Sequence, residues 1–209
     1  IDRGCLLDPF FNPVPNLNTD RQDVAMAIGA CLWVPTSLWD AIGGLPEWFG
    51  SIGEDLYLCC RARLMGNHVR VCASSGYLHR VGASFGGGKV KDGRLSTTSR
   101  RRCLSEQNKT FTMIVCQPMV LLWISLPMHL VLIHLEGLAL TLIKRDAAIW
   151  HRIYAPLVPR QWSERDRLLA ERRVAQLTRT TTLARWLVAF RWAPRKLQML
   201  FRHGVPVLQ

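Results

Sequence analysis

The chain has 209 residues and a mass of 23.8 kDa, which is enough for one sizeable domain or for a domain with an appendage. Apolar residues make up 49% and charged residues 20% of the chain, so a wholly disordered protein is excluded. The formal net charge of +12 is unevenly distributed, because residues 1–143 hold 13 basic and 11 acidic residues whereas residues 144–209 hold 14 and 4. The basic character therefore belongs to the C-terminal part of the chain.

The cysteine content argues against a secreted protein stabilised by disulfides. The chain has seven cysteines, an odd number, and a chain of this size does not need disulfides for stability. Cys59 and Cys60 are adjacent, and no Cys-x-x-Cys spacing occurs. We therefore expect reduced thiols in the core of a protein kept in a cytosolic compartment. No signal peptide precedes the turn that follows Ile1, and we expect an N-terminal portion outside this sequence.

The N-terminal part of the chain predicts a loop, a strand and a short helix. Residues 5–23 are rich in Pro, Asn and Asp and predict an ordered loop. The apolar run from Val24 to Val34 predicts a buried strand that is interrupted at Gly29-Ala30. Pro35 is expected to open a short helix that ends at Gly43-Gly44, because proline suits the first turn of a helix and glycine its end.

A second helix is predicted after a loop at residues 45–53. Ser51 and Glu54 have the spacing of a capping box, in which each side chain binds the backbone N–H of the other residue. The helix is expected to run to about Met65 and to stop at Gly66. Its apolar side forms one stripe at helical spacing, made of Leu56, Cys59, Cys60 and Leu64.

The next part of the chain is glycine-rich and basic. Short extended segments are predicted at residues 69–73 and 76–79. Residues 82–102 then contain a run of glycines at 86–88, scattered lysines and arginines, and an arginine run at 100–102. This composition is typical of a mobile basic loop, which acts either as a flexible linker or as a lid over an anionic ligand.

Residues 110–143 form an apolar segment. From Thr110 to Leu135 there is no Asp, Glu, Lys or Arg, and a helix that crosses a membrane needs about 20 predominantly apolar residues. Prolines and histidines interrupt the run, and Glu136 ends it before apolar residues resume. The segment fits a membrane-embedded or membrane-associated hairpin, and a buried pair of soluble helices is the alternative.

Residues 144–209 predict basic amphipathic helices. Ser163 to Asp166 form a favourable helix start, and an apolar stripe follows farther along. Basic helices with Trp and Phe on their apolar face suit the headgroup layer of an anionic membrane surface. Zinc-finger spacing and aromatic RNA-binding signatures are absent, so no nucleic-acid partner is expected. The apolar stripe consists of Leu183, Trp186, Leu187 and Phe190.

Residues 29–88 carry an ordered set of motifs. In chain order these are Gly29-Ala30, Gly43-Gly44, Trp48-Phe49, Gly53-Glu54-Asp55, Arg61, Gly66, His79 and Gly82-Ala83-Ser84. Their order and spacing resemble the C-terminal half of a catalytic domain of glycosyltransferase family 2, which has the GT-A fold. A weaker resemblance continues through Gln107-Asn108 into the apolar segment and the basic tail. The resemblance implies an α/β fold, with a partial, Rossmann-like GT-A half-domain followed by a mostly α-helical C-terminal segment.

The resemblance implies roles for two acidic residues. An inverting transfer from a nucleotide-diphosphate sugar needs a general base for the acceptor hydroxyl and positive charge for the leaving diphosphate. By resemblance, Asp55 is the general base and Glu54 is the neighbour that orients the pocket. As an isolated pair, these carboxylates would only favour the first turn of a helix.

The resemblance also implies residues for the metal, the acceptor and the donor. A divalent cation, Mg²⁺ or Mn²⁺, is expected in the complete enzyme with His79 as a supplementary ligand, although a lone histidine at a strand end is more often structural. Trp48 and Phe49 form a stacking wall for the acceptor sugar, or they simply pack their loop. The donor and its diphosphate are assigned to Gly29, Ala30, Arg61 and Arg80.

The sequence departs from the family pattern in several places. Tyr57 stands where relatives commonly have an acid after the Glu-Asp pair, and Leu45-Pro46 replaces the usual Phe-Asp. The Gln-x-x-Arg-Trp signature of processive synthases is absent, which favours the addition of a single sugar. The nucleotide-binding half of the family domain, with its Asp-x-Asp metal motif, is not in these residues, so the chain alone is expected to be inactive.

We therefore expect three parts: an acceptor-side half-domain at residues 1–109, a membrane-associating helical segment at 110–143 and a basic helical tail at 144–209. The complete enzyme is expected to move a sugar from a nucleotide-diphosphate donor to a lipid-linked or cell-envelope glycan acceptor. Its expected location is the cytoplasmic face of the cell membrane. The alternative is a non-catalytic peripheral membrane scaffold, or an inactive remnant, with a basic amphipathic anchor.

Overall fold

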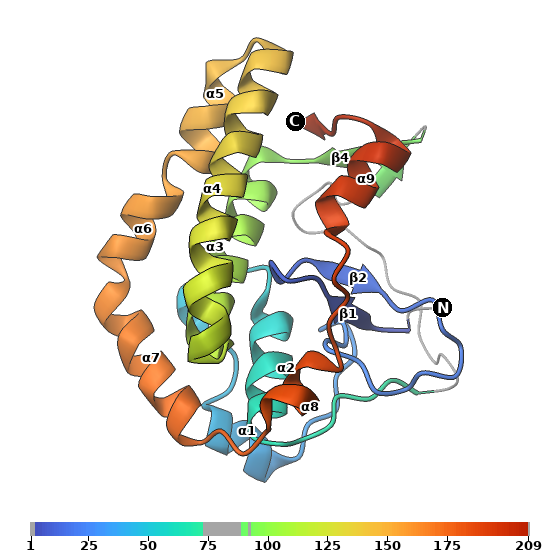
Figure 1. Ribbon diagram of the computed structural model, residues 1–209, viewed down its shortest axis with the longest axis vertical. Helices are drawn as coiled ribbons and strands as arrows, with labels where there is room; N and C mark the ends of the chain where they lie inside the picture. The colour runs from blue at the N-terminus through green and yellow to red at the C-terminus, as the bar shows by residue number, and fades with distance from the viewer. Residues whose placement is uncertain (1–2, 73–88, 92, 209) are drawn as a thin grey trace.

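The computed structural model describes residues 3–72, 89–91 and 93–208 of the chain (Figure 1). These residues form a mixed α/β structure that is mostly helical and has small sheets. The expected α/β class is confirmed at this level. The strands in the described part of the chain are short and do not form a Rossmann-like sheet.

The N-terminal segment forms a small hairpin instead of a loop followed by a long strand. Strand β1 (Cys5–Leu7) pairs antiparallel with β2 (Pro13–Pro15), within the predicted loop. The strand predicted from Val24 to Val34 is wrong. Residues 24–26 are buried and Met26 makes a single bridge to Cys5, but the chain then turns outward into solvent.

Two predicted helices are confirmed, and only the expected cap at the start of the second differs. Helix α1 (Thr36–Ile42) ends at Gly43, whose φ of 86° requires the freedom of glycine. A short 3₁₀ helix η1 (Glu47–Phe49) leads to α2 (Glu54–Leu64). The capping box is wrong, because Gly53 is the N-cap residue of α2 and no side chain caps the helix. The predicted stripe of α2 is buried, and the remaining residues between Leu56 and Leu64 are all buried as well.

A three-stranded sheet joins the middle of the chain to its C-terminal end. β3 (Lys89–Lys91) pairs antiparallel with β4 (Arg94–Thr97), and β4 pairs in parallel with β5 (Val207–Leu208). The predicted mobile loop at residues 82–102 is therefore wrong at its C-terminal side, where this hairpin and the first turn of the next helix lie. The predicted segment 76–79 and the glycine run at 86–88 lie outside the described residues.

The apolar segment is divided between two long helices. Helix α3 (Ser99–Cys116) has a buried second half, so the expected boundary between residues 109 and 110 falls inside one helix. Helix α4 (Met119–Lys144) follows after a turn at Gln117-Pro118. One face of α4 is buried at intervals of three or four residues and its other face is exposed. The buried face consists of Leu122, Ser125, His129, Ile133, Gly137 and Leu140.

The tail is helical, as predicted. Figure 1 shows its first helices following one side of α3 and α4, while β1, β2 and α9 lie on the other side. No side chain caps α7, so the predicted capping by Ser163 is wrong. The elements are α5 (Ala147–Ile149), the π-helix η2 (Trp150–Tyr154), α6 (Leu157–Ser163), α7 (Arg165–Leu177), α8 (Leu183–Leu187) and α9 (Arg195–His203).

The predicted membrane-facing stripe of the tail is wrong for its aromatic residues. Trp186 is 1% and Phe190 8% exposed, and both rings pack beside Phe11 in the main core. The indole N–H of Trp186 donates to the side-chain oxygen of Gln117 at 3.1 Å. A buried indole that finds an acceptor contributes to core packing, so this part of the tail closes the fold around α3.

Candidate functional site at the start of helix α2

Asp55 is held at the first turn of α2 by backbone N–H groups. Its Oδ2 accepts a hydrogen bond from the N–H of Gly29 at 3.0 Å, and its Oδ1 lies 2.8 Å from the N–H of Leu56. The residue is half-buried. The carboxylate therefore has a fixed direction and remains within reach of solvent, which is what a proton acceptor needs.

Gly29 allows the close approach of the two segments. A Cβ atom at this position would lie 3.2 Å from the Cβ of Asp55, which is tighter than ordinary van der Waals contact. Gly29 and Ala30 are both exposed. The structure thus brings together two parts of the predicted motif set that are 26 residues apart in the chain.

Glu54 contributes an acidic oxygen without a partner in the described part of the chain. Its Oε2 is buried and forms no hydrogen bond there. A buried carboxylate oxygen without a donor is costly, and such atoms in native structures often mark ligand sites. Glu54 lies in the first turn of α2, where a negative charge is favourable, but it does not cap the helix.

Asn108 holds the loop that leads into α2. Its side-chain amide nitrogen lies 3.1 Å from the carbonyl oxygen of Phe49 and 2.8 Å from those of Ser51 and Ile52. Ile52 has a φ of 68°, an unfavourable conformation for a β-branched residue. Asn108 is fully buried and thereby fixes the backbone just before Asp55. Sequence reasoning gave Asn108 no role, and the only signal for it was the weak Gln107-Asn108 resemblance.

Arg61 lies away from Asp55, in the interface between α2 and α7. It is fully buried, its Nη1 donates to the hydroxyl of Tyr57 at 3.0 Å, and the same nitrogen lies 3.6 Å from Glu171. Burial raises the pKa of Tyr57, so its hydroxyl stays protonated and donates to Glu171. The structure does not bring Arg61 together with Gly29 and Asp55, and its diphosphate role stays a prediction.

Trp48 and Phe49 form part of an aromatic cluster. Phe49 is 2% exposed, and its ring packs against Phe111 and Tyr57. Trp48 is half-buried, lies edge-on to Phe49 at 4.6 Å between ring centres, and carries the guanidinium of Arg167 over its ring at 5.6 Å. Phe49 therefore packs the core, and only Trp48 retains surface for an acceptor.

The remaining predicted site residues are not described. His79 and Arg80 lie outside the described residues, so their roles as metal ligand and diphosphate contact stay predictions. Within the described residues, no group of three His, Cys, Asp or Glu side chains could hold a metal ion. Comparison with protein-family models, with curated proteins and with solved structures gave no match to this chain.

A second polar centre, which sequence reasoning missed, lies on another face of α3. Glu106 is 2% exposed; its Oε2 lies 2.5 Å from the Nζ of Lys109 and its Oε1 lies 2.8 Å from the Nζ of Lys196. Lys196 also binds Glu136 at 2.6 Å, and Arg102 pairs with both carboxylates. Lys196 comes from α9, 90 positions away from Glu106, so no local pattern signals the cluster.

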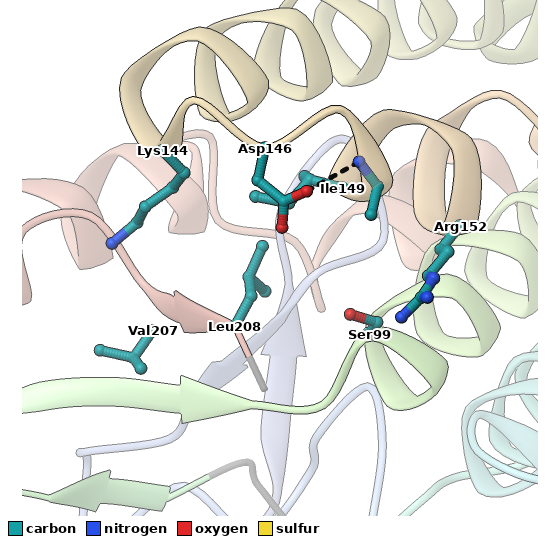
Figure 2. Close-up of a pocket in the computed structure, with 8 residues that line it drawn as sticks. Ser99, Lys144, Asp146, Ile149, Arg152, Val207 and Leu208 are labelled. Carbon is teal, nitrogen blue, oxygen red and sulfur yellow. Dashed lines mark hydrogen bonds between the residues drawn. The ribbon is translucent and has the colours of Figure 1, made fainter.

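Two cavities have been located away from Asp55. One, of about 310 Å³, lies at the start of α3 and is lined by Ser99, Lys144 and Arg152 among others. Figure 2 shows the Asp146 carboxylate turned into this cavity, where it accepts a hydrogen bond from the N–H of Ala148 at 2.9 Å. The negative charge of Asp146 partly offsets the positive charges of Lys144 and Arg152. The other cavity lies beside the cluster around Glu106.

Proposed function

We propose that this chain is the acceptor-side half of an inverting glycosyltransferase of family 2, with a GT-A fold completed by residues outside the printed sequence. The observation that carries the proposal is the contact between Gly29 and Asp55. The Gly-Ala segment and the Glu-Asp helix start are separate motifs in the sequence, and the resemblance requires them to share one site. Their 3.0 Å hydrogen bond supports that requirement.

In the proposed reaction, Asp55 takes the proton of the acceptor hydroxyl as that oxygen attacks the anomeric carbon of the donor sugar. The bond from that carbon to the diphosphate breaks, and the nucleoside diphosphate leaves with the bonding electrons. A general base of this kind contributes roughly 10²–10⁴-fold to the rate. The expected Mg²⁺ or Mn²⁺ would neutralise the leaving diphosphate, and a site with three His, Cys, Asp or Glu ligands would need at least one ligand from outside the described residues.

Helix α4 supports the membrane association that the proposal includes. Among the described residues, one helix, α4, is long and apolar enough to cross a membrane, and only 22% of its most apolar window is buried. Its outer face carries large apolar side chains, and Lys144 and Arg145 follow at its C-terminal end. The exposed side chains include Val120, Trp123, Ile124, Val131, Leu135 and Leu142. An apolar face that ends in basic residues suits the boundary between acyl chains and anionic headgroups.

The same surface also favours the second candidate, a non-catalytic membrane scaffold. The two proposals differ in whether the intact protein recognises a nucleotide sugar. We therefore suggest incubating the intact protein with panels of UDP-, GDP- and dTDP-sugars and a lipid extract, and measuring the release of nucleoside diphosphate. The variants are Asp55→Asn and, as a matched control, Asp40→Asn on the exposed surface of α1.

We expect Asp55→Asn to lower turnover by about 10²–10⁴-fold while affinity for the nucleoside diphosphate is retained. Asp40→Asn should leave both quantities unchanged. Near-normal turnover of Asp55→Asn would refute the base assignment. The absence of nucleotide-sugar binding in the intact wild-type protein would refute the enzyme proposal and leave the scaffold.

A further inference from the structure

A cavity of about 600 Å³ lies between α3, α4 and α9. This volume falls within the range of roughly 300–1,000 Å³ that is usual for small-molecule sites. Most of its wall is apolar, and α4 and α9 supply the two long sides. The apolar residues that matter here are Leu132, Leu135, Ala139 and Ile143 from α4 and Leu197 and Leu200 from α9.

The cavity opens onto the exposed apolar face of α4. Leu135 and Ile143 line the cavity and are nevertheless 55% and 61% exposed to solvent. On the opposite side, Leu197 and Leu200 of α9 are also exposed. These four exposed side chains make the apolar wall continuous with the surface that we place against the membrane. A hydrocarbon chain could pass from the bilayer into the cavity without contact with water.

The inner end of the cavity is charged. Arg102, Glu106, Glu136 and Lys196 line it, and they form the paired cluster described above. Lys109 binds Glu106 from behind, and Asp8 and Arg195 complete the charged lining. The charged lining therefore consists of three basic and three acidic side chains. Lys109, which binds Glu106 without lining the cavity, adds a fourth basic side chain and leaves one positive charge in excess in the cluster as a whole. The side chain of Lys196 is 29% exposed, against 15% for Arg102 and 5% for Lys109, so Lys196 is the most accessible of these three ion-paired cations.

We infer that this cavity binds one tail of a membrane phospholipid whose headgroup carries a single negative charge. The apolar walls accept the hydrocarbon tail, and the one excess positive charge of the cluster at the inner end complements the single net negative charge of such a headgroup. The continuity with the outer face of α4 identifies the bilayer as the source of the ligand. This inference goes beyond the proposed glycosyl transfer, because it concerns lipid binding alone and holds for an enzyme or a scaffold.

The test is photo-crosslinking of the intact protein in vesicles. The probe is phosphatidylglycerol with a photoactivatable group in one tail, and the same probe with a phosphatidylcholine headgroup is the comparison. Labelled peptides are then located by mass spectrometry. We expect labels on residues 132–143 and 197–206, with on the order of fivefold more labelling from phosphatidylglycerol, because each basic residue near the surface adds a modest attraction for anionic lipid.

Two variants separate the cavity from the membrane surface. Ala139→Phe fills the cavity from α4, and Leu200→Trp narrows it from α9 if the first variant does not fold. Ala170→Phe on the exposed side of α7 is the matched control. Because each change adds apolar surface, vesicle binding should not weaken. Labelling inside the cavity should fall at least about fivefold in the first two variants and stay unchanged in the control.

Two variants of Lys196 test the preference for an anionic headgroup. Lys196→Gln should remove the preference for phosphatidylglycerol, and Lys196→Arg should retain it. Labels confined to the outer residues of α4, or labelling that Ala139→Phe and Leu200→Trp do not change, would overturn the cavity assignment. Equal labelling by the two headgroups in the wild-type protein would overturn the assignment of an anionic lipid.

Discussion

The side-chain amide of Asn108 lies 2.8 Å from the carbonyl oxygen of Ile52, and this hydrogen bond connects the buried helix α3 to the loop that presents Asp55. The same amide also reaches the carbonyl oxygen of Ser51. Asn108 therefore acts as a positioning residue, because it holds an unfavourable backbone conformation at Ile52 without itself reaching the candidate site.

The first prediction concerns Asn108→Ala. The change leaves buried carbonyl oxygens without donors, so we expect the free energy of unfolding to fall by about 1–3 kcal/mol. Urea denaturation followed by tryptophan fluorescence measures this. The control is Asn67→Ala, at an exposed position after α2, which should change stability by less than about 0.5 kcal/mol. Equal stability of the two variants would contradict the role of Asn108.

The second prediction concerns the contact between α4 and η2. A Cβ atom at Gly137 would lie 2.5 Å from Cγ of Tyr154, which is buried, so the side chain and the helix must move apart. We expect Gly137→Ala to lower the free energy of unfolding by about 1–3 kcal/mol. In a Tyr154→Ala background the same change should cost far less, because the ring is gone. If Gly137→Ala lowered the free energy of unfolding equally in both backgrounds, contact with the Tyr154 ring would not be what excludes a side chain at residue 137.

The third prediction is a pH dependence of stability that comes from Glu106. Burial alone would raise the pKa of this carboxyl, but Lys109, Lys196 and Arg102 together hold it well below the usual 4.5. Its contribution to stability is therefore complete above pH 4.5 and is lost as the pH falls through the lower pKa of the folded state.

Urea denaturation at a series of pH values below 4.5 tests this dependence. The free energy of unfolding of the wild-type protein should decrease as the pH falls. Glu106→Gln should be less stable than the wild type at neutral pH and should show a shallower decrease, because one of the contributing carboxyls is gone. An unchanged slope in this variant would contradict the assignment.

The fourth prediction concerns the cysteines, all of which are free. Burial raises the pKa of the Cys59 and Cys116 thiols to about 12, and Cys60 is also fully buried. Because the thiolate is the reactive form, these residues should resist alkylation near pH 8 until the protein unfolds. Cys31 and Cys72 are exposed and should be modified first, as peptide mass spectrometry would show. Rapid labelling of Cys60 in the folded protein would contradict the burial.

Local signals in the sequence predicted the helices well. Helices α1 and α2 are bounded by Pro35, Gly43, Gly53 and Gly66, and these residues act through their own backbone conformations. The prediction of a strand at residues 24–34 was wrong because a strand, unlike these helices, does not depend on local signals alone. An apolar run becomes a strand only where a partner strand is available, and the backbone hydrogen bonds between β1 and this segment are confined to Ala25 and Met26.

The candidate site likewise has features that the sequence predicted and features that it could not predict. The motif order predicted that Gly29 and Asp55 belong together, and they are in contact. The role of Asn108 and the cluster around Glu106 could not be predicted, because each depends on residues that are distant in sequence. The stripe at Trp186 had the spacing of a membrane helix, yet its indole lies in the core, where it donates a hydrogen bond to Gln117.

The parallel pairing of β5 with β4 has a consequence for how this protein is handled in the laboratory. β5 secures the end of α9, and the adjoining Val205 and Pro206 close one side of the large cavity. Deletion of residues 204–208 would remove β5 and loosen α9, and it would thereby weaken the pairing of Lys196 with Glu106 and Glu136. Lipid-binding measurements therefore call for a protein in which these residues are intact.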